Sequence, residues 1–368
     1  MFEWLRHRGL IAAADVLAGD ASVTPRHSRN ANFAVTAGDR SWFVKQAERV
    51  GPVHGPSVDV EARVLELIAA SPAFAELAPF VPRLPVGASG GVLITELLEG
   101  ETLRAAVRAL ATRSVPPAQV VGTVRDAAPS TDLATAGAML GRSLATLHEA
   151  PLDAVSPLER TGHVHRTLPW FLHIAERSDA RDGAHPDSLG GTLRALVIEH
   201  GFAEPLAAIV ADWRRDAFIH GDIKGENVVL TPNGPVLTDW ETADVGDADW
   251  DVAGLLHTCL ALWVVSMPAE EALDGATLAT RAGLDPDAMA PMLRGFWKAY
   301  AGARGFASDD HVRLERVARL TAGRLVQAAA EHSSDDTLSA SARRLLQIAR
   351  HTLDEPLEML DEVLGMGS

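Results

Sequence analysis

The segment HGDIKGEN, residues 220–227, brings an acid, a lysine and an amide into one short stretch. Asp222 is followed by Lys224 after two residues and by Asn227 after five. A carboxylate can orient a hydroxyl group or accept its proton, an ammonium group can neutralise a phosphoryl group in transfer, and an amide oxygen suits Mg²⁺. These residue types indicate transfer of a phosphoryl group from a nucleotide to an alcohol.

A second metal ligand is predicted shortly afterwards, in VVLTPNGPVLTDWE. Pro232, Asn233 and Gly234 are turn residues between two apolar stretches, so this sequence predicts a β-hairpin centred on residue 233. In such a hairpin Asn227 lies directly opposite Asp239, with about 5 Å between their Cα atoms. We therefore predict that Asn227 and Asp239 bind Mg²⁺ together.

A lysine and a glutamate near the N-terminus extend this set. Residues 31–46 alternate apolar and polar side chains around a Gly-Asp turn, which predicts a β-hairpin with Lys45 near the end of its second strand. Residues 57–70 predict a helix, in which Glu61 lies at the edge of the apolar stripe and Glu66 points to water. The stripe consists of positions 60, 64, 67 and 68. We predict that Lys45, paired with Glu61, holds the phosphates of the donor.

Lysine is rare in this chain. Lys45, Lys224 and Lys298 are its three lysines, against thirty arginines. Two of the three stand at the predicted phosphate site, where a compact ammonium group suits a crowded environment better than a guanidinium group.

Composition and charge narrow the classes of function. The 368 residues are 47% hydrophobic, which is enough for two lobes with their own cores, and the net charge of −16 argues against a nucleic-acid partner. Residues 1–101 carry nine basic and twelve acidic side chains, a net charge of −3, which leaves −13 for the rest. That acidic part either attracts a cationic substrate or is a solvated surface. The single cysteine, Cys259, excludes an intramolecular disulfide and fits an intracellular protein.

The sequence predicts neither a membrane span nor a signal peptide. The longest apolar run, residues 254–268, is interrupted by His257 and is shorter than the roughly 20 residues that a span needs, so it predicts a buried helix. Glu3 and Asp15 interrupt the N-terminal stretch that would otherwise resemble a signal peptide. We expect a soluble cytoplasmic protein without a membrane partner.

The loop H-x-D-x-K-x-x-N followed by D-x-E resembles the protein-kinase-like superfamily, and within it the aminoglycoside phosphotransferase branch, in which HGD and DWE occupy these places. The similarity extends from Asn30 to about Leu256. It implies a bilobal α+β fold, with a small N-lobe made of an antiparallel sheet and one main helix, and a larger, mainly helical C-lobe. We place the nucleotide-binding lobe at residues 1–97 and the helical lobe at residues 98–368.

The resemblance also implies a role for each motif residue. Asp222 corresponds to the catalytic base, Asn227 and Asp239 bind magnesium, and Lys45 pairs with Glu61, while Lys224 keeps the role inferred above, that of neutralising the phosphoryl group in transfer. The segment after Thr95 corresponds to the hinge that contacts adenine, so ATP is the expected donor, with GTP left open because the hinge reads the base through its backbone. The hinge residues are Glu96, Leu97 and Leu98.

Three further residues are predicted to support the loop. His220 is expected to brace it, Glu241 belongs to the DWE motif, and Asp251 resembles the family's aspartate that holds the catalytic loop, with a helix N-cap as a compatible alternative. About ten residues separate Asp239 from the helix expected near Trp250, which leaves no room for the activation loop of a regulated protein kinase.

The segment RHSRNANF departs from the family pattern because it contains no glycine. Ser28, Asn30 and Asn32 would have to cover the phosphates through side chains or backbone N–H groups.

Two longer strings bear on the acceptor. SRNANFAVTAGDRSWFVKQ and DWETADVGDADWDVAGLLHTCLALWVVSMP are similar to the kinase subunits of class V lanthipeptide synthetases and of thioamide-peptide pathways. That resemblance implies phosphorylation of Ser or Thr in a precursor peptide, followed by elimination on a separate lyase. The alternatives are an antibiotic or other small-molecule kinase and a non-catalytic pseudokinase scaffold, which the joint presence of the charged motif residues disfavours. His163, His165 and Trp170 either belong to the acceptor side or form a surface turn.

Overall fold

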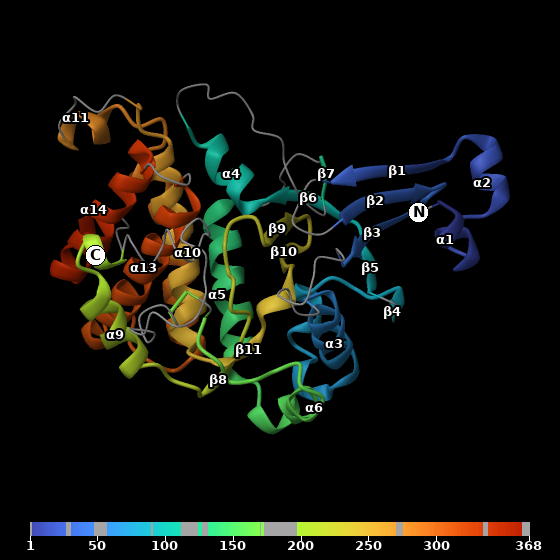
Figure 1. Cartoon of the computed structure of the whole chain (residues 1–368), viewed down its shortest axis with the longest axis horizontal. Coiled ribbons are helices and arrows are strands. Elements are labelled where there is room, and N and C mark those ends of the chain that lie inside the picture. Colours follow the sequence, from blue (N-terminus) through green and yellow to red (C-terminus); the bar gives the residue numbers. More distant parts are fainter. Residues whose placement is uncertain are drawn as a thin grey trace.

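The computed structural model shows a bilobal α+β fold, with a sheet-containing N-terminal lobe beside a larger helical lobe (Figure 1). The structure describes residues 2–26, 31–47, 57–89, 91–111, 124–126, 132–169, 171–172, 197–269, 275–333 and 338–362.

The N-lobe is built on a five-stranded antiparallel sheet with strand order β1-β2-β3-β5-β4. The predicted N-terminal hairpin is confirmed, because β2 pairs with β3 across a two-residue turn and Ala37 faces Arg40. Lys45 lies one residue before the end of β3 and faces Asn32 on β2. The strands are β1 (Ala21–Arg26), β2 (Ala31–Ala37), β3 (Arg40–Gln46), β4 (Val86–Ser89) and β5 (Val92–Glu96).

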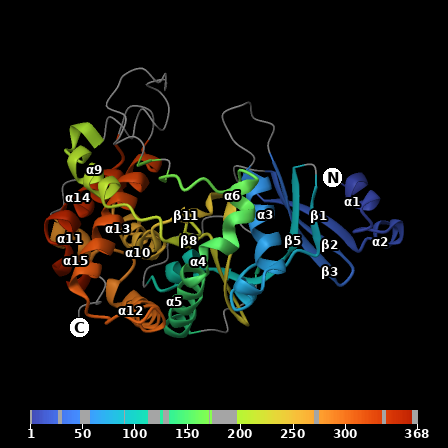
Figure 2. The same cartoon turned by 90° about the horizontal axis from the view of Figure 1, so that it is seen from below.

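Helices cover both faces of this sheet. Two short helices, α1 (Phe2–His7) and α2 (Ala13–Ala18), precede it, and Leu5 and Ile11 pack with Val44 on one face. Helix α3 (Ser57–Ala70) lies on the other side, between the sheet and the C-lobe (Figure 2).

The buried face of α3 differs from the predicted stripe. Glu61 lies in the middle of the buried face rather than at its edge, because Ala62 and Leu65 beside it are also buried, whereas Leu67 of the predicted stripe is half-buried. Glu66 pairs with an exposed arginine on the outer surface. The sequence pattern thus identified the helix but placed its inward face about one residue away from where it packs.

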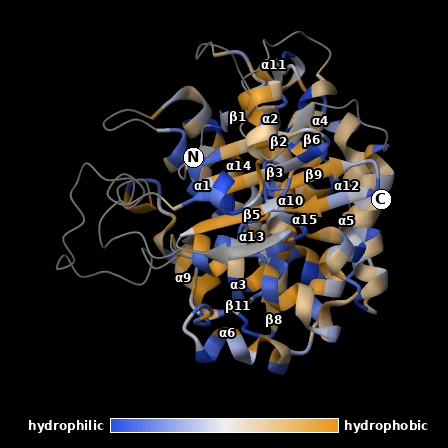
Figure 3. Ribbon diagram, turned by 90° about the vertical axis from the view of Figure 1, so that its right-hand side faces the viewer, coloured by the Kyte–Doolittle hydropathy of each residue, from blue (hydrophilic) through white to orange (hydrophobic). Residues whose placement is uncertain are grey.

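A single residue, Leu97, separates β5 from β6 (Leu98–Thr102), where the chain enters the C-lobe. Strand β6 pairs with β9 (Val228–Thr231) and β7 (Val124–Asp126), and β9 also pairs with β10 (Gly234–Leu237). The lobe boundary between residues 97 and 98 stays a prediction. Figure 3 shows mostly hydrophobic colours along some strands, such as β5, and a mixture of hydrophobic and hydrophilic colours along the helices.

The C-lobe is a helical assembly in which α5 packs on α12, and α13 packs on both α10 and α14. The segment LATAGAMLGRSLATLHEAP has the pattern of an amphipathic helix that ends at His148, and in the structure it forms α5. The longer helices are α5 (Leu133–Glu149), α10 (Ala248–Val265), α12 (Pro286–Ala303), α13 (His311–Glu331) and α14 (Ala340–Asp354). The shorter ones are α4 (Leu103–Ala109), α6 (Ser156–Arg160), α9 (Ala203–Ala211), α11 (Gly275–Thr280) and α15 (Pro356–Glu362).

Helix α10 contains most of the longest apolar run. Among the described helices it is the one that is long and apolar enough to cross a membrane, but 78% of that window is buried inside the protein. The prediction of a buried core helix is confirmed.

The hairpin of β9 and β10 has a different register from the predicted one. Its turn consists of Pro232 and Asn233 alone, because Gly234 already pairs with Thr231. Consequently Thr238 lies opposite Asn227, and its backbone N–H donates to the carbonyl of Asn227 over 2.8 Å. The prediction that Asp239 faces Asn227 directly is therefore wrong by one residue, since a two-residue turn shifts the pairing.

Candidate active site

The segment that we call the catalytic loop, residues 220–227, connects β8 (Ala217–Ile219) to β9 and begins with a buried histidine. The Nε2 atom of His220 lies 3.0 Å from the carbonyl oxygen of Thr238 and its Nδ1 accepts from the backbone N–H of Asp222 over 3.3 Å. Burial lowers the pKa of His220, so the ring is neutral and Nε2 donates. These bonds hold the loop against the end of the β9–β10 hairpin, as a brace does.

Asp251, on the first turn of α10, fixes the two residues that precede Asp222. Its carboxylate accepts from the backbone N–H of His220 over 2.7 Å and from that of Gly221 over 2.9 Å. Gly221 has φ of +82°, a left-handed conformation that favours glycine, and a Cβ atom there would lie 2.4 Å from the carbonyl of Thr242. The cap of α10 is Asp247 instead, so Asp251 serves the loop and not the helix end.

A buried network continues from this aspartate into the helices. His148, from α5, lies 3.2 Å from Asp251 through Nε2 and 2.8 Å from the hydroxyl of Tyr300 through Nδ1. The arrangement assigns the ring proton to Nε2, because the carboxylate can only accept. Three helices therefore support the position of the loop.

Asp222 is surrounded by donors. Lys224 Nζ lies 2.5 Å from Oδ2, and the guanidinium group of Arg324 donates to Oδ1 over 3.2 Å. Asn227 Nδ2 donates to the Asp222 carbonyl over 2.9 Å and to Oδ2 over 3.3 Å. Burial raises the pKa of Asp222, but Lys224 and Arg324 outweigh it and hold the pKa well below its usual range. The carboxylate is ionised at every physiological pH.

Lys45 is buried among three carboxylates. Its Nζ pairs with Glu61 Oε2 over 2.7 Å, with Asp239 Oδ1, and with Glu241 Oε2 over 3.4 Å. Burial lowers the pKa of Lys45, but these three carboxylates outweigh it and raise the pKa above its usual range. The predicted pairing of Lys45 with Glu61 is present, and it extends to the DWE motif.

Asp239 reaches this cluster because of its backbone. It has φ of +67°, one of two positive values among the described residues other than glycine, and the chain turns there from β10 into a short helical turn, Trp240–Thr242. Asp239 is near the site because of this backbone conformation, and not because it pairs directly with Asn227 as predicted. Lys224 also interacts electrostatically with Asp239, so the two halves of the site meet there.

The donor set suits a magnesium ion. Asn227 uses Nδ2 to hold Asp222, which leaves Oδ1 for a metal, while Asp239 and Glu241 supply carboxylates that Lys45 neutralises. Within the described part of the chain no three His, Cys, Asp or Glu side chains gather as a complete metal site. The amide oxygen of Asn227 and these carboxylates fit Mg²⁺, which takes few protein ligands and completes its shell with phosphate and water oxygens.

The connection between the lobes is lined by apolar side chains. Leu97 packs with Ala34 and Phe43 of the sheet, and Leu98 packs with Val229 and Val236 of the second hairpin. Phe43 lies two residues before Lys45 on β3, so both point to the same face of the sheet. Such a pair of apolar layers can bind a flat base.

The structure describes the predicted hinge residue Glu96 but only one of the three residues predicted to cover the phosphates. Glu96 binds Arg83 through its carboxylate, with bonds of 2.9 Å to the backbone N and to Nε, so its side chain is directed to that arginine. Asn32 lies opposite Lys45 in the sheet. Ser28 and Asn30 lie outside the described residues.

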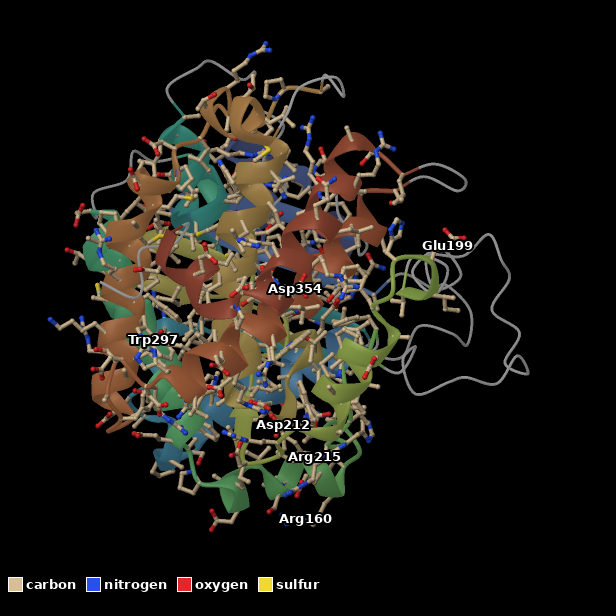
Figure 4. All side chains as sticks on the ribbon, turned by 90° about the vertical axis from the view of Figure 1, so that its left-hand side faces the viewer. Arg160, Glu199, Asp212, Arg215, Trp297 and Asp354 are labelled. Atoms are coloured by element: carbon tan, nitrogen blue, oxygen red, sulfur yellow. The ribbon has the colours of Figure 1, made fainter. Side chains whose placement is uncertain are left out.

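The segment proposed for the acceptor side is tied to the DWE region by Asp244. Its carboxylate accepts from the backbone N–H groups of His165, Arg166 and Thr167 over 2.7 to 3.0 Å. Arg215, labelled in Figure 4, donates through Nε to the carbonyl of Arg166 over 2.8 Å. His163 binds Thr161, and Trp170 lies outside the described residues. The contacts described for residues 163–167 therefore attach this segment to the rest of the protein.

Sequence reasoning missed several residues that contact the catalytic loop. Arg324 comes from α13, and its guanidinium group also lies 4.9 Å from the ring centroid of Trp250. His148 and Tyr300 come from α5 and α12. No motif surrounds these residues in the sequence; the signal lies only in the packing of distant helices.

Comparisons with known proteins identify the family of this chain and the solved structures with a similar fold. A family model described as the phosphotransferase enzyme family matches residues 22–292. No curated protein matches the chain in sequence. The fold is similar to that of Plasmodium vivax ethanolamine kinase, with a TM-score of 0.55, 10% identity, and coverage of 96% of this chain and 86% of that one. Amicoumacin kinase hAmiN, solved with AMP-PNP and Ca²⁺, gives a TM-score of 0.52 at 13% identity and covers 97% and 96%.

Proposed function

Because the chain belongs to the phosphotransferase enzyme family, we propose that it transfers the γ-phosphoryl group of ATP, with Mg²⁺, to the hydroxyl group of a seryl or threonyl residue in a precursor peptide. One observation carries the chemistry: Asp222, Lys224 and Asn227 of the loop meet Lys45 of β3 and Asp239 after β10. A scaffold protein without catalysis needs no such convergence of buried charges.

On this proposal each residue has a separate role in the reaction. Asp222 accepts the hydrogen bond of the acceptor hydroxyl and takes its proton as the oxygen forms a bond to the γ-phosphorus and the bond to the nucleoside diphosphate breaks. Because the pKa of Asp222 is low, its main contribution is to orient the hydroxyl group. Lys224 stabilises the charge of the phosphoryl group in transfer, and Lys45 holds the donor phosphates. Bound Mg²⁺ would neutralise the phosphate oxygens, with Asn227 and Asp239 as its protein ligands.

The peptide acceptor is supported by the resemblance of the strings around Lys45 and Asp239 to kinase subunits of peptide-modifying pathways. On this proposal a separate lyase would eliminate the phosphate, and the protein would act in the cytoplasm. A small-molecule acceptor is the second candidate, because the net charge of −13 beyond residue 101 would attract a cationic antibiotic.

Mass spectrometry tests these candidates directly. The protein with Mg²⁺ and ATP is offered a Ser/Thr-rich precursor-type peptide and, separately, a panel of aminoglycosides. A gain of about 80 Da on the peptide, the mass of one phosphoryl group, supports the peptide proposal, and the same gain on an aminoglycoside supports the second candidate. The same reactions with GTP identify the donor.

Two variants control the experiment. Asp222→Asn should abolish transfer, whereas Asp309→Asn, at an exposed position, should not change it. Transfer at the parent rate by a folded Asp222→Asn protein would refute the assigned role of Asp222. Absence of both transfer and nucleotide hydrolysis in the parent would leave the scaffold reading as the better one.

A further inference from the structure

Helix α10 presents one of its faces to the catalytic loop. Gly254 packs so closely on this loop that a Cβ atom would lie 2.2 Å from the carbonyl oxygen of Ile223, and Thr258 Oγ1 accepts from the backbone N–H of Gly225 over 3.0 Å. His257 lies three residues after Gly254, on the same side of the helix. Its imidazole therefore lies beside the segment that contains Asp222, and the two groups interact electrostatically.

Both ring nitrogens of His257 are buried and make no hydrogen bond to any described residue. The carbonyl of Gly254, which lies near the ring, accepts from Thr258 Oγ1 over 3.0 Å. A buried imidazole without partners destabilises a folded protein, because water satisfied both nitrogens in the unfolded chain. Among the described residues, no hydrogen bond of good geometry to the ring explains why a histidine stands at this position.

Arg324 adds a second unpartnered group next to this histidine. Its Nη2 atom donates to Asp222 Oδ1 and, over 3.0 Å, to the carbonyl of Ile223, but its Nε–H is buried without a partner among the described residues. The guanidinium group lies over Trp250, two helical turns before His257 on α10, and it interacts electrostatically with the histidine ring. Two polar groups without a hydrogen-bond partner among the described residues thus lie next to the segment that contains Asp222.

The charges around these groups restrict what can bind there. Burial and the cations Arg324 and Lys224 lower the pKa of His257 to about 3, so the ring is neutral and offers one donor and one acceptor. The charges that act on the histidine ring are the positive charges of Arg324 and Lys224 and the negative charge of Asp222, while the carboxylate of Asp239 acts on Lys224. An ammonium group near the reacting hydroxyl would be repelled, whereas an oxygen that accepts hydrogen bonds would be attracted.

We propose that Arg324 Nε–H and the imidazole of His257 form an acceptor subsite for an uncharged, hydrogen-bonding oxygen next to the reacting hydroxyl, such as the amide carbonyl beside a seryl or threonyl side chain. This assignment rests on the proposed phosphotransferase function and specifies its substrate class. It makes His257 a specificity-determining residue that favours an amide-bearing alcohol over an amino alcohol.

The test compares two minimal acceptors, N-acetylserine methylamide and ethanolamine, at matched concentrations with Mg²⁺ and ATP. For the parent enzyme, kcat/KM should be at least about tenfold higher for N-acetylserine methylamide than for ethanolamine. This difference is expected because only the amide can form hydrogen bonds with the buried donors and acceptors of the site. His257→Leu should lower kcat/KM for the amide by about tenfold, mainly through KM, and His257→Gln, which keeps hydrogen-bonding groups, should restore most of it. His351→Gln, at an exposed position, is the matched control.

Thermal unfolding separates this role from a structural one. Because the imidazole has no hydrogen-bond partner among the described residues, His257→Leu should keep or raise the Tm, whereas replacing a histidine that stabilised the fold would lower it. A parent enzyme that prefers ethanolamine, or a folded His257→Leu protein with unchanged kcat/KM for the amide, would overturn the subsite and leave the phosphotransferase function in place. If the parent transfers phosphate to no alcohol of any kind, the proposed function itself fails, and the subsite fails with it.

Discussion

Replacing Asp251 by asparagine is a sharp test of how the catalytic loop is held. The carboxylate is fully buried and accepts from His220 N–H over 2.7 Å, from Gly221 N–H over 2.9 Å and from His148 Nε2 over 3.2 Å. Asparagine has the same shape but only one accepting oxygen. Since both backbone donors are fixed, the amide nitrogen must face one of them in either orientation, and that hydrogen bond is replaced by a repulsive contact.

The size of the effect follows from these contacts. A hydrogen bond to a charged group contributes about 1.5 to 3 kcal/mol, and leaving its buried donor unmet adds to the loss. Part of this loss of stability is offset, because the variant has no charged carboxylate that must be desolvated on folding. We expect the free energy of unfolding to fall by about 2 to 3 kcal/mol. A loop displaced by about 1 Å should lower kcat roughly a hundredfold, with a smaller change in the KM for the nucleotide.

The assay pairs urea unfolding with steady-state phosphoryl transfer to whichever acceptor the mass-spectrometry experiment identifies. Asp285→Asn is the matched control, because Asp285 is an exposed N-cap of α12 that accepts one bond, from Asp287 N–H over 3.0 Å, and asparagine caps helices equally well. Its effect should stay within about 0.5 kcal/mol. If Asp251→Asn unfolds at the parent urea concentration and keeps the parent kcat, the loop is positioned by other contacts and this reasoning is wrong.

Three further predictions concern charges of the site. Lys45→Met should lower kcat by about 10² to 10³ and, because it releases Asp239 and Glu241, should tighten Mg²⁺ binding without nucleotide, measured by calorimetry with the exposed Lys298→Met as control. Arg324→Met removes one of the two cations that hold down the pKa of Asp222, so the acid limb of the pH–rate profile should move to higher pH; an unchanged profile would contradict the pairing. The folded pKa of Asp222 is lower than its unfolded value of about 3.9, so its ionised form stabilises the fold above about pH 4, and this contribution is lost as the pH falls. At pH 7 the Asp222→Asn protein should therefore have a lower free energy of unfolding than the parent protein, and this difference should be smaller at about pH 3. Denaturant titrations at both pH values measure it.

Local patterns in the sequence were enough to place the N-terminal hairpin, α3, α5 and the core helix α10. In each case the signal is a periodicity or turn that depends on neighbouring residues, so no tertiary information is required. The spacing of Asp222, Lys224 and Asn227 in one loop is likewise a property of the chain, because residues two and five apart in a short loop cannot separate far. The register of the second hairpin was beyond this reasoning, because Pro232, Asn233 and Gly234 are all turn residues and only pairing decides which two form the turn.

The sequence by itself therefore identified the motif residues that meet in the structure, and these are the residues that we propose for the chemistry. The tertiary structure alone decided what surrounds Asp222. Arg324 lies 102 residues further along the chain, and it is one of the chain's thirty arginines, on a helix that carries no motif. Its place beside Asp222, and that of His257 with its two unmet nitrogens, follow from the packing of α13 on α10. Such contacts depend on how whole helices pack, and no spacing along the chain encodes them.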